Sequence, residues 1–277
     1  MRTRPFGPQR EPVAAIGQGT WRLKDPAAAV AALEEGIRLG MTHIDTAELY
    51  EQGSRSETVL GPIVARHRPR LFLASKVLPK NGSAKGVRAA CLASLKRLQT
   101  DCLDLYYHHW REGSVPLDET LRALAGLVDD GRIRMVGVSN YDVGDLDQAE
   151  SILGRGRLAA NQVLYHLADR GIEAEVLPWC RRRKVTLVAY SPFGGDRVGF
   201  PAGKRAEVLD EVARGLGKTP RQVVLAFLLR FPEVVAIPKA ERLEHVRENA
   251  GGDFDLPRDA VARLEEAFPL KPGLRVI

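Results

Sequence analysis

Cysteine, long apolar runs and leader-like segments are scarce in this 277-residue sequence. Its three cysteines, Cys91, Cys102 and Cys180, are widely separated, which argues against a disulfide framework or a metal cluster and favours a reducing, cytoplasmic setting. No apolar run approaches the roughly 18 residues that cross a bilayer, and residues 1–12 lack the apolar core of a signal peptide. We therefore expect a cytoplasmic protein with no metal and no membrane partner.

A strong charge of one sign is also lacking, because the formal net charge is only +6. The densest basic cluster, CRRRK at 180–184, directly precedes the apolar run VTLVAY. Cations in the last turn of a helix are favoured by the helix dipole, and no interleaved aromatic residues suggest a nucleic-acid partner. With 44% apolar and 27% charged residues, the chain is typical of a globular protein whose excess positive charge favours an anionic ligand.

Short β-branched runs alternate with helical patterns along the whole chain. The candidate strands are 15–21, 42–45, 71–76, 103–109, 133–140, 159–163, 186–191 and 234–238, and the clearest helical patterns are 25–40, 83–99, 116–132 and 219–231. Eight such units in about 250 residues predict a single α/β domain over 1–277, closed as a (β/α)8 TIM barrel. An N-terminal β-hairpin within 11–19, an extra C-terminal helix at 256–268 and a short tail complete it. A doubly wound sheet is the alternative, but GQGTWRL at 17–23 has only two glycines of its fingerprint.

Polar side chains stand at the end of nearly every predicted strand. Barrel enzymes build their sites from these ends and from the loops that follow them. The polar residues at these ends are Asp45 and Tyr50, Lys76, His108 and His109, Ser139 and Asn140, Gln162, Tyr190 and Ser191, and Lys239.

Each residue also has a structural interpretation. Asp45 and Thr46 could cap a helix, Lys76 could be a solvated lysine, and Tyr190 could only pack. Adjacent residues on a strand face opposite ways, so one of His108 and His109 points into the barrel mouth and the other into the helix layer. The joint pattern, rather than any single residue, favours a site.

A carboxylate, a phenol, an ammonium and an imidazole have a shared chemical use. A phenol with a pKa of about 10 is a weak acid at neutral pH, and a nearby ammonium lowers that pKa. The phenol can then protonate a carbonyl oxygen as hydride reaches the carbon, while an imidazole orients that oxygen.

At these residues the chain resembles the aldo-keto reductase family, nearly from end to end. The motifs are HIDTAELY (43–50), LASK (73–76), LDLYYHHW (103–110), GVSN (137–140), NQV (161–163), AYSP (189–192) and IPK…EN (237–249). Phrases such as GQGTWR look similar to bacterial members described as methylglyoxal reductases. The resemblance implies Asp45, Tyr50, Lys76 and His109 as catalytic residues, with Tyr50 as general acid. His108 takes a position that is usually aliphatic in the family.

The resemblance also implies an oxidoreductase that binds NADPH, rather than NADH, without a metal, and reduces small aldehydes, ketones or α-dicarbonyls as a monomer. Trp21, Tyr50, Leu78, Trp110 and Phe193 are expected to line the substrate pocket. The implied cofactor-binding residues are Thr20, Trp21, Ser139, Asn140, Gln162, Tyr190, Ser191, Phe193, Ile237, Lys239, Arg242, His245, Glu248 and Asn249.

Ala240 stands where many members have Ser or Thr, and His245 stands where many have an arginine that clamps the 2′-phosphate, whereas Lys239 and Arg242 remain as phosphate partners. One alternative is a catalytically weak regulatory subunit that binds the cofactor. The other is a phosphate-binding isomerase or aldolase, which would need a glycine-rich loop that AIPKAER lacks.

Overall fold

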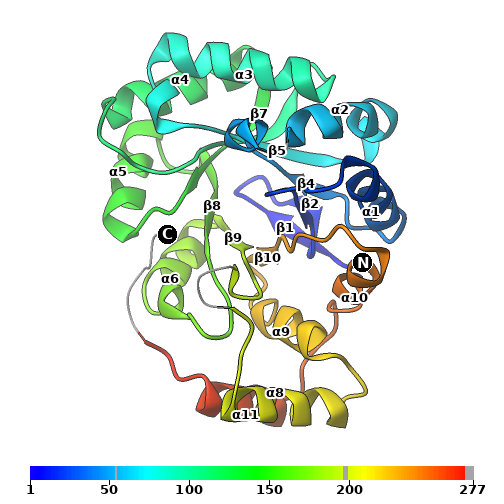
Figure 1. The fold of residues 1–277 in the computed structure, drawn as a ribbon. Helices are drawn as coiled ribbons and strands as arrows, with labels where there is room; N and C mark the ends of the chain where they lie inside the picture. The colour runs from blue at the N-terminus through cyan, green and yellow to red at the C-terminus, as the bar shows by residue number, and fades with distance from the viewer. Residues whose placement is uncertain (54, 196–198, 272–277) are drawn as a thin grey trace.

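Eight parallel strands form a barrel in the computed structural model, which describes residues 1–53, 55–195 and 199–271 (Figure 1). The strand order follows the chain from β3 to β10, and the closing pairs are Ile16 with Ala236 and Gly19 with Lys239. The strands are β3 (Gln18–Gly19), β4 (His43–Asp45), β5 (Phe72–Val77), β6 (Leu103–His108), β7 (Ile133–Ser139), β8 (Leu158–Leu164), β9 (Thr186–Tyr190) and β10 (Val234–Ala236). The predicted TIM barrel is confirmed.

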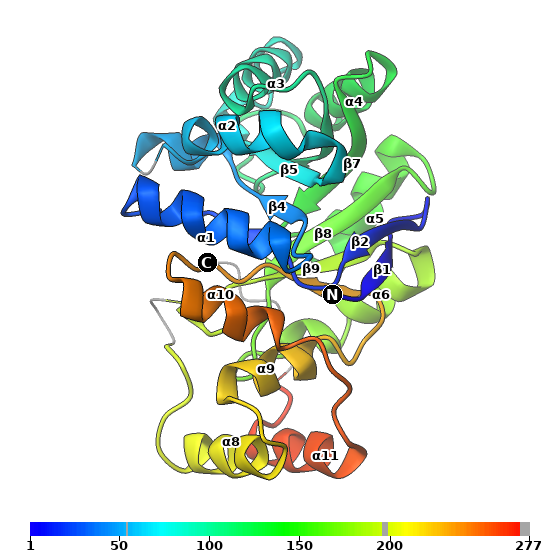
Figure 2. The same cartoon turned by 90° about the vertical axis from the view of Figure 1, so that its right-hand side faces the viewer.

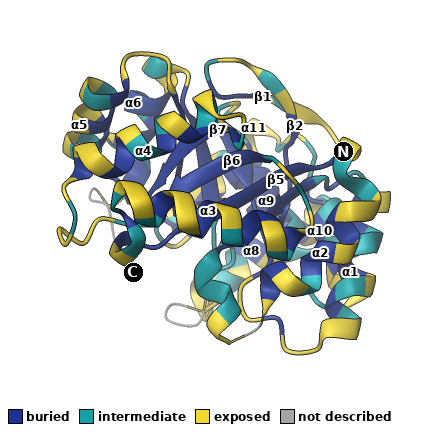
Figure 3. Cartoon of the chain, turned by 90° about the horizontal axis from the view of Figure 1, so that it is seen from above, coloured by how far each residue is buried: buried dark blue, intermediate teal, exposed yellow. Residues whose placement is uncertain are grey.

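Helices cover the outside of the barrel, and their exposed faces point away from the buried strands (Figure 3). They are α1 (Pro26–Arg38), α2 (Ser56–His67), α3 (Ala84–Leu98), α4 (Leu117–Asp129), α5 (Val143–Leu153), α6 (Val176–Arg183), α9 (Pro220–Leu228) and α10 (Leu243–Ala250). Two more, α8 (Lys204–Gly215) and α11 (Arg258–Ala267), lie together beyond α9 (Figures 1 and 2). The extra C-terminal helix is therefore present, while residues 272–277 of the predicted tail lie outside the described residues.

Local sequence explains where these helices begin and end. Asp25 caps α1 by accepting from the backbone nitrogens of Ala27 and Ala28, and Pro26 occupies the first turn. The basic cluster at 180–184 ends α6, with three arginines in its last turn, as the dipole argument predicted. No described helix is long and apolar enough to cross a membrane.

The N-terminal hairpin is present, but its predicted bounds were wrong. Strand β1 (Thr3–Phe6) pairs with β2 (Glu11–Ala14), whereas residues 15–19 continue into the barrel closure. Phe6 and Val13 of the hairpin pack with Phe72 and other interior side chains, so the hairpin closes the N-terminal end of the barrel. The predicted first strand shortens to two residues, and a side chain at Gly17 would meet the His43 carbonyl oxygen at 2.6 Å.

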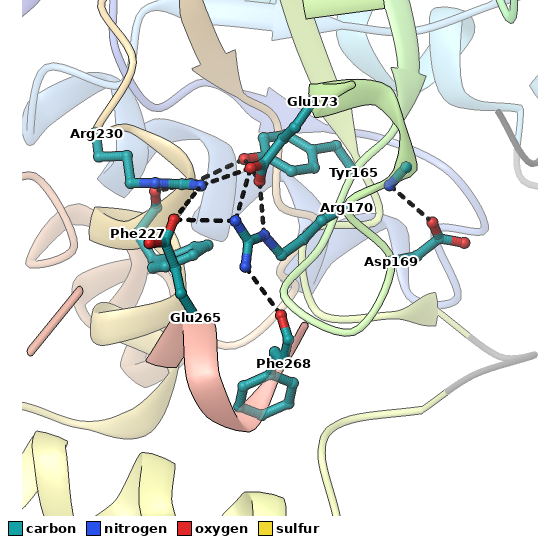
Figure 4. Close-up of polar contacts among 9 residues, drawn as sticks. Tyr165, Asp169, Arg170, Glu173, Phe227, Arg230, Glu265 and Phe268 are labelled. Carbon is teal, nitrogen blue, oxygen red and sulfur yellow. Dashed lines mark hydrogen bonds and ion pairs between the residues drawn. The ribbon is translucent and has the colours of Figure 1, made fainter. Parts of the chain in front are cut away.

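A network of buried charges attaches the C-terminal helix to the barrel (Figure 4). Glu173 accepts hydrogen bonds from Arg170 and Arg230 at 2.8 Å, and also from the Tyr165 hydroxyl at 2.6 Å. Arg170 also donates to the Phe268 carbonyl, directly after α11, at 2.9 Å. The loop after β8 and the end of α9 are thereby tied to α11.

His43, at the start of β4, has a buried imidazole that makes the folded protein less stable at acidic pH. Its ring lies edge-on to Phe72, with 5.1 Å between centroids, and neither ring nitrogen has a hydrogen-bond partner among the described residues. Burial lowers the pKa of His43 from 6.5 to about 4. The unfolded chain therefore binds this proton more readily than the native protein does, and stability falls as the pH drops from 6.5 towards 4.

We predict that His43→Leu weakens this acid destabilisation. From pH 7.5 to pH 5.0, His43 should account for about 2 kcal/mol of lost stability in the wild type, a contribution absent from the variant. Urea unfolding of both proteins at the two pH values measures the difference. Equal losses in the two proteins would contradict the assignment.

Candidate active site

A buried ion pair lies where β4 and β5 end at the barrel mouth. The Lys76 ammonium donates to Asp45 Oδ1 at 2.5 Å and to the Thr46 carbonyl at 2.8 Å. The second carboxylate oxygen of Asp45 accepts from Gln162 Nε2, on β8, at 2.7 Å. Asp45 is 2% and Lys76 0% exposed, so Lys76 is not a solvated lysine, and Asp45 makes no helix-capping bond. Paired and hydrogen-bonded in this way, both charges can be buried.

Two features of the surroundings of Lys76 oppose the effect of burial on its charge. Burial lowers the pKa of Lys76, and the Asp45 carboxylate opposes that shift. The ammonium also lies over two aromatic rings, 5.4 Å from the ring centroid of Tyr50 and 5.7 Å from that of Tyr107. The sequence analysis did not select Tyr107. The signal that could have found it is an aromatic residue at a position of β6 whose side chain faces the barrel interior.

Tyr50 reaches this centre from the short helix η1 (Glu48–Gln52), directly after β4. Its ring is 5.4 Å from that of Trp21 and 6.1 Å from that of His109. Burial raises the pKa of Tyr50 well above 10, and the Asp45 charge adds to the increase. The expectation that Lys76 lowers this pKa is therefore wrong for the protein alone, because desolvation of the phenolate dominates. The hydroxyl stays protonated at neutral pH.

His109 and His108 face opposite sides of the sheet, as predicted. The His109 backbone nitrogen donates to the Val77 carbonyl at 3.1 Å, and its ring contacts that of Trp110, with 4.6 Å between centroids. Burial lowers the pKa of His109 well below 6.5, assisted by the Lys76 charge. The imidazole is therefore neutral, and its Nδ1 has no hydrogen-bond partner among the described residues. His108 instead bonds to Tyr141 in the helix layer.

Asn140 forms a sharp turn beside this centre. Its φ of 61° is left-handed, and its backbone nitrogen donates to the Gln162 carbonyl at 2.8 Å. Its side chain bonds to Ser139 Oγ at 3.2 Å and accepts from the Tyr190 hydroxyl at 2.9 Å. The predicted amide and hydroxyl groups of β7, β8 and β9 are thus brought together, although the Gln162 amide nitrogen is committed to Asp45.

The remaining predicted cofactor residues form a second group along β9, β10 and α10. Lys239 pairs with Glu241 at 2.5 Å, and Arg242 and His245 are exposed. The Lys239 backbone bridges to Gly19, which in turn pairs with Asp45, so Lys239 lies two strands from the Asp45–Lys76 pair at the same end of the barrel. The other members of this second group are Ser191, Phe193, Ile237, Glu248 and Asn249, whereas Thr20 donates to the Asp45 carbonyl at 2.9 Å.

The expected pocket residues differ in exposure. Trp21 is 47% exposed, whereas Leu78 is buried, and Trp110 and Phe193 are half-buried. Phe193 packs on Phe200, at 6.3 Å between centroids, in the loop after β9.

Sequence reasoning missed two carboxylates that support the mouth. Glu48 accepts from the Leu78 backbone nitrogen at 2.5 Å and from Asn81. Glu57 is fully buried on α2, where it accepts from Ser75, next to Lys76, at 2.5 Å and pairs with Arg97. The pattern gave a weak signal for Glu48, because it lies inside the HIDTAELY motif, and none for Glu57.

Residues 15–268 match the profile described as the Aldo/keto reductase family. The chain belongs to the aldo/keto reductase family. Methylglyoxal reductase YeaE of Escherichia coli is 42% identical over 265 residues, which cover 94% of this chain and 92% of that protein. Membership assigns this aldo/keto reductase to the NAD(P)H-dependent oxidoreductases and confirms the family resemblance of its motifs.

Solved structures agree with this assignment. An aldo/keto reductase from Klebsiella pneumoniae, in complex with NADP and acetate, superposes with a TM-score of 0.90 at 40% identity, covering 100% of this chain and 99% of that one. The thermostable aldo-keto reductase Tm1743, in complex with the inhibitor epalrestat, gives 0.89 at 37% identity, covering 96% and 100%.

We predict that Lys76→Met destabilises the protein by about 3–5 kcal/mol, because Asp45 would be left as a buried charge without its counter-ion. The double variant Asp45→Asn/Lys76→Met should recover most of that loss, since neither charge remains. Denaturant midpoints of the three proteins measure this. A loss below about 1 kcal/mol in Lys76→Met would mean that the pair is not charged or not dry.

Proposed function

We propose that this aldo/keto reductase uses NADPH to reduce small aldehydes and α-dicarbonyls, methylglyoxal among them, with Tyr50 as general acid. The observation that carries the proposal is the convergence of a protonated phenol, a buried ion pair and a neutral imidazole at one end of the barrel. The likeness to a methylglyoxal reductase supports the substrate class.

The residues at the mouth fit a nicotinamide dinucleotide. Ser139, Asn140 and Gln162 offer hydroxyl and amide groups that suit a carboxamide, and Tyr190 offers an aromatic face beside them. Lys239 and Arg242, which follow β10, suit a phosphate. When bound, the reduced nicotinamide supplies a hydride to the carbonyl carbon.

The chain's own residues supply the proton and the orientation. Tyr50 stays protonated, so it can donate to the carbonyl oxygen, and the Lys76 ammonium beside its ring stabilises the phenolate that remains. Asp45 and Gln162 hold that ammonium in place. The neutral His109, whose ring lies 6.1 Å from that of Tyr50, can hydrogen-bond to the same oxygen and orient it.

Trp21, Leu78, Trp110 and Phe193 suit a substrate with a modest apolar part, and two of them, Trp21 and Trp110, contact the rings of Tyr50 and His109. The predictions of one domain, a monomer and a cytoplasmic location stay predictions.

Replacing Tyr50 by Phe should lower kcat for methylglyoxal by about 10²–10⁴-fold while the NADPH dissociation constant changes little, because only the proton donor is removed. NADPH oxidation and fluorescence titration measure the two quantities. Retained turnover in Tyr50→Phe would exclude this tyrosine as the acid. Negligible turnover in the wild type despite tight cofactor binding would instead favour the regulatory-subunit alternative.

NADPH should be preferred over NADH, but by a modest factor. Lys239 and Arg242 can meet a 2′-phosphate, yet Lys239 already pairs with Glu241, and His245 replaces a fixed-charge guanidinium. The ratio of kcat/KM for the two cofactors, measured at several ionic strengths, tests this expectation. A preference for NADH would overturn it.

A further inference from the structure

An outer hydrogen-bond network of three polar residues lies on the outer side of the sheet, directly behind the candidate site. His108 Nδ1 lies 2.8 Å from the Tyr141 hydroxyl. The Asn161 side chain donates to the Tyr141 carbonyl at 2.9 Å and accepts from the Tyr141 backbone nitrogen at 3.4 Å. His108 is 5% exposed and the other two are fully buried, so all three polar groups lie in the layer between the sheet and the helices.

Each residue of this outer hydrogen-bond network is the sequence neighbour of a residue at the mouth. His108 precedes His109, Tyr141 follows Asn140, and Asn161 precedes Gln162. Neighbouring side chains on a strand point to opposite faces, so a bond on the outer face fixes the backbone from which the inner side chain projects. The outer hydrogen-bond network therefore joins the ends of β6, β7 and β8, the same three segments that carry the candidate site.

Packing alone does not account for these residue types. Tyr141 belongs to the apolar cluster beneath the helices, where leucine or phenylalanine would avoid the cost of burying a polar group. The cost is met because the imidazole and the phenol satisfy each other. Removing one polar group leaves the other buried without its partner, whereas removing both does not. Single and double variants can therefore distinguish the hydrogen bond from packing.

The backbone turn at Asn140 has a conformation that neighbouring contacts must hold in place. A left-handed backbone is unfavourable for a residue other than glycine and persists where flanking contacts impose it. Asn140 is anchored to β8 by its own nitrogen, and its side chain donates to the His109 carbonyl at the long distance of 3.4 Å. On its other side, the Tyr141 hydroxyl bond to His108, at 2.8 Å, is a second and shorter side-chain link from the turn back to β6.

We propose that His108 and Tyr141 are positioning residues, whose hydrogen bond sets the place of the Asn140 turn relative to His109. The inference rests on the proposed function, in which Asn140 faces the nicotinamide and His109 the carbonyl. Loss of the bond lets the turn relax, which weakens cofactor binding and misaligns the carbonyl with the proton donor.

Tyr141→Phe and the double variant His108→Leu/Tyr141→Phe test the proposal. Tyr165→Phe is the matched control, because it also removes a buried phenol that bonds to another side chain, in the network around Glu173. For each protein, the NADPH dissociation constant is measured by fluorescence, kcat and KM for methylglyoxal by NADPH oxidation, and stability by thermal unfolding.

Tyr141→Phe should raise the NADPH dissociation constant about fivefold, as expected for one lost hydrogen bond, and lower kcat as well. Tyr165→Phe should lose stability but keep both kinetic values within about twofold. The double variant should regain stability, since no polar group is left unpaired, while its binding and kcat stay impaired.

Two results would overturn the proposal: kinetics of Tyr141→Phe that match those of Tyr165→Phe, or a double variant that regains both stability and wild-type kinetics. A wild type that binds NADPH without turning over methylglyoxal would overturn the proposed function alone. The comparison of dissociation constants would still decide the role of the pair.

Discussion

The Lys76 ammonium, buried without solvent exposure against the Asp45 carboxylate, constrains the rest of the barrel mouth. Two charges out of water are tolerable only with close pairing and with their remaining donors and acceptors satisfied. The Thr46 carbonyl and the Gln162 amide meet that need, and in doing so they fix the ends of β4, β5 and β8 relative to one another. The ring of Tyr50 then lies against the ammonium, 5.4 Å from it at the centroid. A centre arranged in this way has its electrostatics set before any ligand arrives.

The outer face of the sheet supports the inner one with polar contacts of its own. Behind Lys76, Ser75 bonds to the buried Glu57, which pairs with Arg97 on α3. Behind His109, His108 bonds to Tyr141. An apolar helix layer resists compression but permits sliding, whereas directional hydrogen bonds also define register. Placing such bonds one residue away from the mouth fixes the backbone without exposing the bonds to water.

Much of this arrangement was predictable from the sequence, because it follows from periodicity and from the direction of parallel strands. The strand runs, the polar ends carrying Asp45, Lys76 and His109, and the opposite facing of His108 all follow from local rules. The partner of β2 was not predictable, since residues 3–6 contain an arginine and a proline and show no strand pattern. Nor was the role of Glu57, which depends on how α2 and α3 pack. The raised pKa of Tyr50 was missed because burial, a property of the folded chain, outweighs the neighbouring charge.

The central claim is that Lys76 is a charged ammonium held by Asp45 beneath Tyr50. Lysine-specific 15N NMR of the wild type, with the Lys76 signal assigned by its absence from Lys76→Met, measures this charge directly. The account predicts an ammonium signal at pH 7.5 that exchanges slowly with water. A neutral amine at that pH would contradict the account, because neither the ion pair nor the stabilised phenolate could then exist.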